Sequence, residues 1–141
     1  MQPQSASPVD PRVAGDSAEP QAVLLIAHGS RRAAANADIV QLAGILARDA
    51  VFPIIEPAYL ELAEPDIQTA GVKCVERGAR VVRLLPYFLS AGAHVVDDLR
   101  AHRDELAERF PQVEFVLCPP LGLHPLMIEI VRARLGELLP G

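Results

Sequence analysis

Short apolar runs alternate with longer stretches of helical period along most of this chain. The apolar runs are residues 22–27 (AVLLIA), 53–60 (PIIEPAYL), 79–85 (ARVVRLL) and 113–118 (VEFVLC). Most of them are continuous in hydrophobicity, which is typical of strands buried on both faces of a parallel sheet. The pattern therefore predicts four strands of one sheet.

The stretches between and after these runs have apolar positions on one stripe and charged positions on the other, as helices packed on a sheet do. They begin near Ala34, Pro65, Gly92 and His124. Pro65 suits the first turn of the second helix and Gly78 its left-handed C-terminal cap. With right-handed crossovers, all four helices lie over the two sheet faces. We expect an α/β fold: a three-layer open sandwich with a mainly parallel, flavodoxin-like βαβαβαβα unit.

The first 20 residues differ from the rest of the chain. Residues 1–20 are rich in Pro, Ser, Gln and acidic residues and have little to bury, which indicates a disordered leader. The remaining residues, 21–141, suffice for a single domain. Half of all residues are hydrophobic but only 4% are aromatic, so we expect a core of Leu, Val, Ile and Ala.

The charge and the cysteines exclude several classes of protein. A net charge of −5 disfavours binding to nucleic acid or to an anionic membrane. Cys74 and Cys118 form no CxxC motif, and we expect two buried, reduced thiols. No apolar run reaches the roughly 18 residues of a membrane span, and no secretory signal is recognisable. We expect a cytoplasmic protein.

Two histidines follow apolar runs, and one acidic residue follows a third. His28 closes AVLLIAH, His94 lies in LLPYFLSAGAH, and Glu61 follows the second run. Parallel strands meet at one carboxyl edge, where open α/β sheets place their chemistry. Two imidazoles and a carboxylate suit Fe²⁺, Co²⁺ or Ni²⁺ with positions left open for exchange. Structural roles at a strand end or a helix start remain alternatives for both histidines.

Three other polar residues are expected to have structural roles. His102 lies on a charged helical stretch and is expected to be solvated. His124 opens the last helix, where capping competes with lining the cleft. Glu56 is expected to be an exposed or ion-paired strand residue.

Four motifs in register along the chain resemble the sirohydrochlorin chelatases of the short CbiX/SirB type. They are LLIAHGSR, YLELAEPDI, LLPYFLSAGAHVVDDL and PPLGLHP, and the resemblance covers about residues 22–138. It implies a class II chelatase fold and the insertion of cobalt or ferrous iron into sirohydrochlorin, in cobalamin or siroheme biosynthesis. Nickel is the alternative metal within the same class.

The resemblance also implies roles for individual residues. His28, His94 and Glu61 match the residues that bind the metal and take part in catalysis, with His94 as the first choice for the base. Longer relatives contain two such units, so a homodimer enclosing the tetrapyrrole is implied. We expect Ser30, Arg31 and the space at Gly92 to receive the tetrapyrrole. The metal is a substrate, and no organic cofactor is expected.

Two other functions compete with this interpretation. A histidine phosphatase would also contain a His-Gly pair, but Ala27 stands where that class places a phosphate-binding arginine. A non-enzymatic metal carrier or regulatory module would use the same histidines and bind metal without processing sirohydrochlorin.

Overall fold

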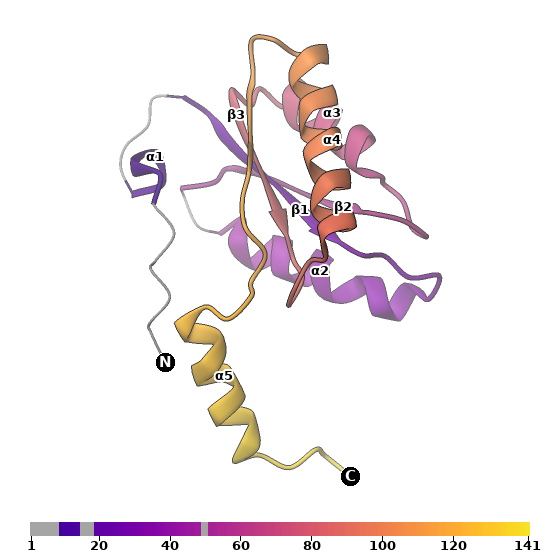
Figure 1. Ribbon diagram of the computed structural model, residues 1–141, viewed down its shortest axis with the longest axis vertical. Helices are drawn as coiled ribbons and strands as arrows, with labels where there is room; N and C mark the ends of the chain where they lie inside the picture. The colour runs from indigo at the N-terminus through magenta and orange to yellow at the C-terminus, as the bar shows by residue number, and fades with distance from the viewer. Residues whose placement is uncertain (1–8, 15–18, 49–50) are drawn as a thin grey trace.

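The sheet has four parallel strands in the order β2-β1-β3-β4 (Figure 1). A computed structural model describes residues 9–14, 19–48 and 51–141. The strands are β1 (Gln21–Ala27), β2 (Ile54–Tyr59), β3 (Val81–Pro86) and β4 (Glu114–Leu117). This confirms the predicted α/β class and the four predicted strands to within two residues at each end.

The described helices are α1 (Pro11–Ala14), α2 (Ala33–Leu46), α3 (Ile67–Glu76), α4 (Ala93–Arg109) and α5 (Pro125–Leu135). Helices α3 and α4 cover one face of the sheet, which we call the closed face. Helix α2 packs on the other face, over β1 and β2. None of the helices in the described residues is long and apolar enough to cross a membrane.

The closed face contains the larger core. Leu24, Leu84, Leu99 and Leu106 are fully or almost fully buried there. Gly71 lets α3 approach α4, because a Cβ at this position would lie 2.8 Å from both methyl groups of Leu106. The strands thus bury apolar side chains on both faces of the sheet, as their continuous hydrophobicity predicts.

The start of α3 differs from the prediction. Pro65 is not in the first helical turn but precedes the helix, after a cis Glu64–Pro65 bond. Asp66 is the N-cap, and its carboxylate accepts a hydrogen bond from the backbone N–H of Thr69 at 2.7 Å. The hydrogen bond of the Asp66 cap sets the start of the helix and outweighs the preference of proline for the first turn. Gly78 follows the helix with φ +98°, which confirms its role in the C-terminal cap.

Helix α5 is also not where the sequence pattern put it. It extends away from the sheet toward the C-terminus (Figure 1), and all of its residues remain at least partly exposed. The expectation that all four predicted helices cover the sheet is therefore wrong for α5. Helical periodicity reports that a segment has an apolar side but not which surface that side meets.

Residues 9–14 of the expected leader are attached to the sheet. Asp10 lies 3.1 Å from the guanidinium of Arg83, Arg12 pairs with Glu114, and the side chain of Gln21 donates to the carbonyl of Arg12 at 2.8 Å. This contradicts the expected disorder for these six residues. The cause is Arg83, whose buried guanidinium requires an anion. Residues 1–8 and 15–18 of the expected leader lie outside the described residues.

The two cysteines differ in burial. Cys74 is completely buried on the closed face, as expected, whereas Cys118 is only half-buried just after β4. Both are free thiols. Burial raises the pKa of Cys74 to about 12 and also raises the pKa of Cys118. Neither thiol therefore has the properties of a reactive cysteine.

Candidate functional site

The carboxyl ends of β1 and β2 continue to pair beyond the strands. The backbone N–H of Leu60 donates to Ala27 at 2.9 Å, and that of Glu61 donates to His28 at 3.0 Å. The structure thereby brings the backbones of His28 and Glu61 side by side at this edge. Both side chains are exposed.

Gly29 fixes the approach between these two segments. Its φ is +95°, and a Cβ built there would lie 1.8 Å from the carbonyl oxygen of Glu61 and 3.2 Å from the Cβ of Tyr59. The first contact is with backbone, which has no side-chain freedom to move aside. Only glycine permits both this conformation and this distance, so the HGS segment depends on residue 29 having no side chain.

The ring of His28 stacks on Phe88. The ring centroids are 4.0 Å apart and the planes differ by 18°. Phe88 is buried, and the neighbouring Tyr87 N–H donates to the carbonyl of Ile26 at 2.7 Å, which extends the pairing of β1 with β3. The buried ring of Phe88 therefore orients an otherwise exposed imidazole.

The turn between His28 and α2 is held by Asn36. Its side-chain oxygen accepts from the N–H of Ser30 at 3.0 Å, and its amide donates to the carbonyl of Ser30 at 2.8 Å. The hydroxyl of Ser30 accepts from the N–H of Arg32 at 3.1 Å, and Tyr59 donates to the carbonyl of Asn36 at 3.2 Å. Ser30 thus contributes to the turn, while Arg31 beside it is exposed.

His94 lies in the first turn of α4, after the loop that follows β3. It is exposed, and Gly92 is the N-cap of the helix with extended backbone. A Cβ at Gly92 would meet no atom within 4 Å. The space expected at Gly92 is therefore present, and a ligand can approach the helix start without displacing protein atoms.

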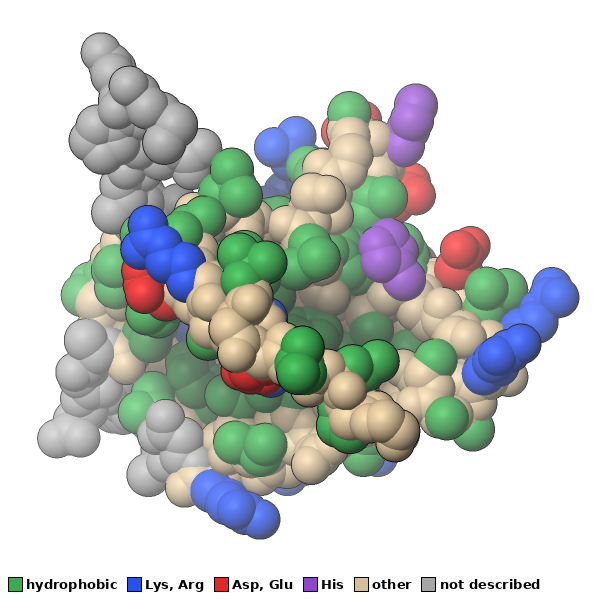
Figure 2. Space-filling view, turned by 90° about the horizontal axis from the view of Figure 1, so that it is seen from below, with side chains coloured by type: hydrophobic (Ala, Val, Ile, Leu, Met, Phe, Trp, Pro, Cys, Tyr) green, Lys and Arg blue, Asp and Glu red, His purple; other side chains and the backbone are tan. Residues whose placement is uncertain are grey.

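The three predicted ligands do not form a closed metal centre. Among the described residues, no group of three or more His, Cys, Asp or Glu side chains is close enough to hold a metal ion. Figure 2, which views the molecule from the lower side of Figure 1, shows exposed histidine and acidic side chains on that face. Exposed, separated donors suit a metal that is transferred rather than one retained as a structural ion.

The other two histidines have structural contacts. His102 is half-buried between α4 and α3, where Gln68 lies 3.2 Å from its ring nitrogen and donates to its carbonyl at 3.1 Å. The expectation that His102 is solvated is therefore wrong, because α3 packs on that side of α4. The ring of His124 accepts from the N–H of Leu126 at 3.1 Å, which supports the capping alternative.

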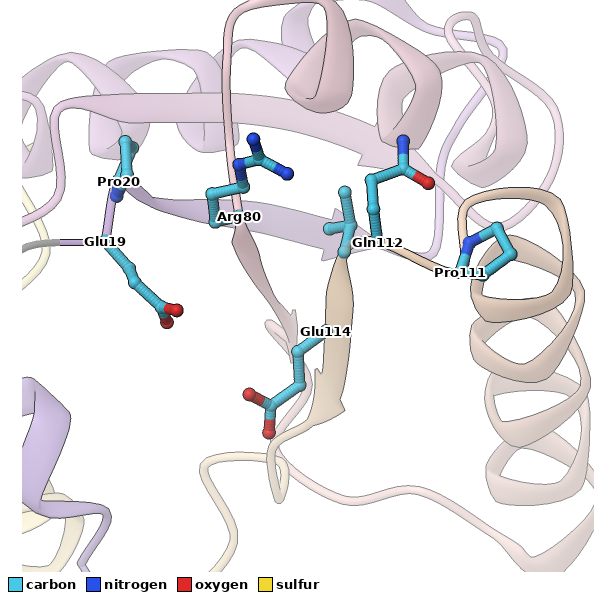
Figure 3. A pocket seen from close by; sticks show the side chains of 7 residues that line it. Glu19, Pro20, Arg80, Pro111, Gln112 and Glu114 are labelled. Atoms are coloured by element: carbon cyan, nitrogen blue, oxygen red, sulfur yellow. The ribbon is translucent and has the colours of Figure 1, made fainter.

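A cavity of about 500 Å³ lies at the opposite end of the sheet. It is lined by residues that precede β1, β3 and β4 and by the first residue of β4 (Figure 3): residues 19–20, Arg80 and residues 111–114. Parallel α/β sheets place their chemistry at the other end of the strands. This cavity is therefore separate from the edge that holds His28 and Glu61.

Phe88 and Asn36 also belong to this site, and neither was expected there from the sequence. Phe88 follows the third apolar run and was indistinguishable from a core residue, which it also is. Asn36 bonds to Ser30 six residues before it, which is farther than the local side-chain bonds that asparagine usually forms, so no short-range pattern indicates this contact. Both residues position the turn around His28.

Comparison with known proteins gives a consistent result. The CbiX family model matches residues 22–138. The sirohydrochlorin ferrochelatase of Arabidopsis thaliana chloroplasts is 33% identical over 83% of this chain and 52% of its own length. The sirohydrochlorin cobaltochelatase of Sulfolobus acidocaldarius is 28% identical over 83% of this chain and 91% of its own length. The sirohydrochlorin chelatase SirB of Bacillus subtilis subspecies spizizenii, solved with cobalt, superposes with a TM-score of 0.76 at 28% identity, over 83% of this chain and 50% of that structure.

The matched segment contains all three candidate residues, His28, Glu61 and His94. The chain spans about half the length of the first curated relatives it matches. The cobaltochelatases of Sulfolobus acidocaldarius and Sulfurisphaera tokodaii are matched over 91% and 92% of their length. The shared motifs, the fold and the family match agree with one another: this chain belongs to the CbiX family.

Proposed function

We propose that this chain is a sirohydrochlorin chelatase that inserts a divalent metal, cobalt or ferrous iron, into the tetrapyrrole. The observation that carries the proposal is the CbiX match, which spans the carboxyl edge where His28 and Glu61 are adjacent. Relatives matched over the same segment are named as ferrochelatases and cobaltochelatases of sirohydrochlorin. Neither a phosphatase nor a metal carrier is among the names of the relatives cited here.

Metal insertion requires little of the protein beyond positioned donors. Two pyrrole N–H protons must leave while the metal ion exchanges water for ring nitrogens. A neutral imidazole can accept such a proton or bind the metal. We assign the base to His94, because it stands beside the open space at Gly92. His28, held by Phe88, and Glu61 would guide the metal ion to the ring.

The tetrapyrrole supplies the remaining metal ligands, so the protein needs no closed ligand set of its own. Its carboxylates require positive partners, and Arg31 is exposed beside the predicted site. The N–H groups at the start of α4 would add to this attraction. A homodimer would enclose the macrocycle between two such edges. Nickel as the metal, the pathway and a cytoplasmic location remain predictions.

The first experiment is an anaerobic absorbance time course with sirohydrochlorin and Co²⁺, Fe²⁺ or Ni²⁺ in separate reactions, each against a protein-free control. We expect acceleration with cobalt or iron. His94→Ala removes the proposed base and should reduce the enzymatic rate by about 100-fold or more, since positioned acid–base groups contribute about 10²–10⁴-fold. His28→Ala removes a donor that guides the metal ion and should also reduce the rate. His102→Gln, about two turns farther along α4 and against Gln68 of α3, should retain the wild-type rate.

Each possible result is informative. Near-normal rates in His28→Ala or His94→Ala would refute the proposed site. Folded protein that accelerates insertion of none of the three metals would refute the chelatase, and metal binding without turnover would then favour a carrier or regulatory module. Circular dichroism of each variant ensures that the fold is intact when rates are compared.

A further inference from the structure

Helix α2 begins with four alanines and one asparagine, in the sequence AAANA at residues 33–37. Alanine has the highest helix propensity, and asparagine in its place lowers the stability of a helix. Asn36 is not the cap of α2, because the N-cap is Arg32, which makes no side-chain cap bond. The half-buried amide of Asn36 therefore has a use outside its own helix.

This amide binds both backbone groups of Ser30. Its oxygen accepts from the N–H of Ser30 at 3.0 Å, and its nitrogen donates to the carbonyl of Ser30 at 2.8 Å. In the part of the chain that the structure describes, no other group bonds to these two backbone atoms. Paired residues of neighbouring antiparallel strands exchange two bonds in the same way. A single side chain thus takes the place of a strand as the partner of the turn.

Strand β2 holds Asn36 in turn. The hydroxyl of Tyr59, a buried residue at the end of β2, donates to the carbonyl of Asn36 at 3.2 Å. Two residues after Tyr59, the N–H of Glu61 donates to the carbonyl of His28 at 3.0 Å. Hydrogen bonds therefore connect Asn36 both to the turn that follows His28 and to the strand that leads to Glu61.

Gly29 makes the position of His28 depend on these bonds. The residue has φ +95° and no Cβ, so its own conformational preference is weak. Glu61 holds the chain before Gly29, through the carbonyl of His28. Asn36 holds the chain after Gly29, through the two backbone groups of Ser30. Without the second anchor, Gly29 can adopt other backbone angles, and the imidazole of His28 is no longer held in one place.

We propose that Asn36 is a positioning residue for metal insertion, which acts by holding the turn that places His28. The inference rests on the proposed function, in which His28 guides the metal ion to the tetrapyrrole. An imidazole that binds a metal ion has to approach it to about 2 Å, and a misplacement of about 1 Å can lower a rate about 100-fold. Asn36 bonds only to the turn and takes no direct part in the chemistry.

Asn36→Asp is the most informative variant, because it keeps the size of the side chain. The carboxylate can still accept from the N–H of Ser30, but its second oxygen faces the Ser30 carbonyl and cannot donate to it. An acidic residue near the start of a helix is stabilising, so α2 is retained. We expect Asn36→Asp and Asn36→Ala each to lower the insertion rate about 10-fold or more. A wild-type rate in Asn36→Asp would overturn the proposal.

Asp38→Ala is the matched control on the same helix. Asp38 is exposed, and within the described residues its side chain has no hydrogen bond or ion pair. Asp38→Ala should retain the wild-type rate, and circular dichroism should show that every variant is folded. An equal loss of rate in Asp38→Ala would show that the rate follows the integrity of α2 rather than the turn, and would overturn the proposal.

A double-mutant cycle shows whether Asn36 acts through His28. After His28→Ala has removed the imidazole, a residue that serves only to place this imidazole has no further effect on the rate. The combination of His28→Ala with Asn36→Ala should therefore have the rate of His28→Ala to within about twofold, the scatter with which independent effects add. Losses that multiply would overturn the proposal, because Asn36 would then support a different group.

Crystal structures of the metal-free variants separate this inference from the proposed function. In Asn36→Asp we expect the ring of His28 to leave Phe88, from which its centroid is 4.0 Å away in the wild-type chain. In Asp38→Ala the stack should be retained. A displaced His28 in a chain without chelatase activity would refute the function and leave the placement of His28 by Asn36 standing. Chelatase activity with His28 unmoved in Asn36→Asp would leave the function standing and overturn the placement.

Discussion

The two faces of the sheet are built differently. On the closed face, α3 and α4 pack over the strands, and large side chains such as Leu84, Leu99 and Leu106 are buried. On the other face, α2 packs over β1 and β2, and residues 9–14 lie at the start of β3 and β4 through the ion pairs of Asp10 with Arg83 and of Arg12 with Glu114. Leu85, Val116 and Cys118 on this face are half-buried. The closed face therefore contributes most of the buried apolar core, whereas the other face is only partly covered.

The largest effect should come from a cavity in the closed face. Leu106→Ala removes a fully buried side chain that contacts Gly71, and we expect the free energy of unfolding to fall by about 2–5 kcal/mol. Leu139→Ala, at an exposed residue, should change it by no more than about 0.5 kcal/mol. Urea denaturation measures both. Equal losses in the two variants would contradict the assignment of the core.

A smaller loss in the free energy of unfolding is expected at the ion pair of Glu56, whose side chain lies on the closed face. The carboxylate of Glu56 is largely buried and accepts from Arg77 at 2.9 Å, with Lys73 farther away at 3.7 Å. Arg77→Ala removes the nearer partner of the Glu56 carboxylate. We expect the free energy of unfolding, measured by urea denaturation, to fall by about 1–3 kcal/mol. Arg100→Ala removes an exposed pair with Asp97 and should cost at most about 0.5 kcal/mol. If Arg77→Ala destabilises the protein no more than Arg100→Ala does, the Glu56 carboxylate is solvated.

The ion pairs of Asp10 with Arg12 and Arg83 should give a still smaller, pH-dependent effect. Hydrogen bonds from Arg12 lower the pKa of Asp10 and also that of Glu114. A lowered pKa in the folded state means stabilisation that is present above the pKa of the unfolded state, near ~4, and is lost as the pH falls below it. Asp10→Asn should lower the Tm at pH 7, and the difference from wild type should shrink below about pH 4. A constant difference across this range would argue against the ion pairs.

Thiol labelling compares the two faces without altering the chain. Cys118 on the partly covered face should react with a maleimide before Cys74, whose burial raises its pKa to about 12. Urea should make the two rates equal. Faster labelling of Cys74 in the folded protein would contradict the burial described here.

The strands and the site edge could be predicted because they depend on local sequence. Continuous apolar runs end at His28 and just before Glu61, and parallel pairing of β1 with β2 puts these two ends together. The same reasoning predicted the cap at Gly78 and the open space at Gly92. In each case a backbone requirement is visible in the residue type itself.

The errors concern choices between surfaces. The apolar positions of α5 predict a helix but do not indicate which surface it contacts. Asp10 and Arg12 gave no sign of the buried Arg83 that attracts them, because nothing in the run ARVVRLL reveals which side chain lacks a partner. Likewise His102 was expected to be solvated because Gln68, its partner, belongs to another helix. Long-range polar partners of this kind are not encoded in a local pattern.

The stack of His28 on Phe88 has a spectroscopic consequence. A phenyl ring 4.0 Å from the imidazole and nearly parallel to it shields the imidazole protons through its ring current. The resonances of His28 should therefore lie upfield of those of the chain's three other histidines. Nuclear magnetic resonance can then follow this single side chain while a metal ion or a tetrapyrrole is added, and can report when the ring leaves the phenyl surface.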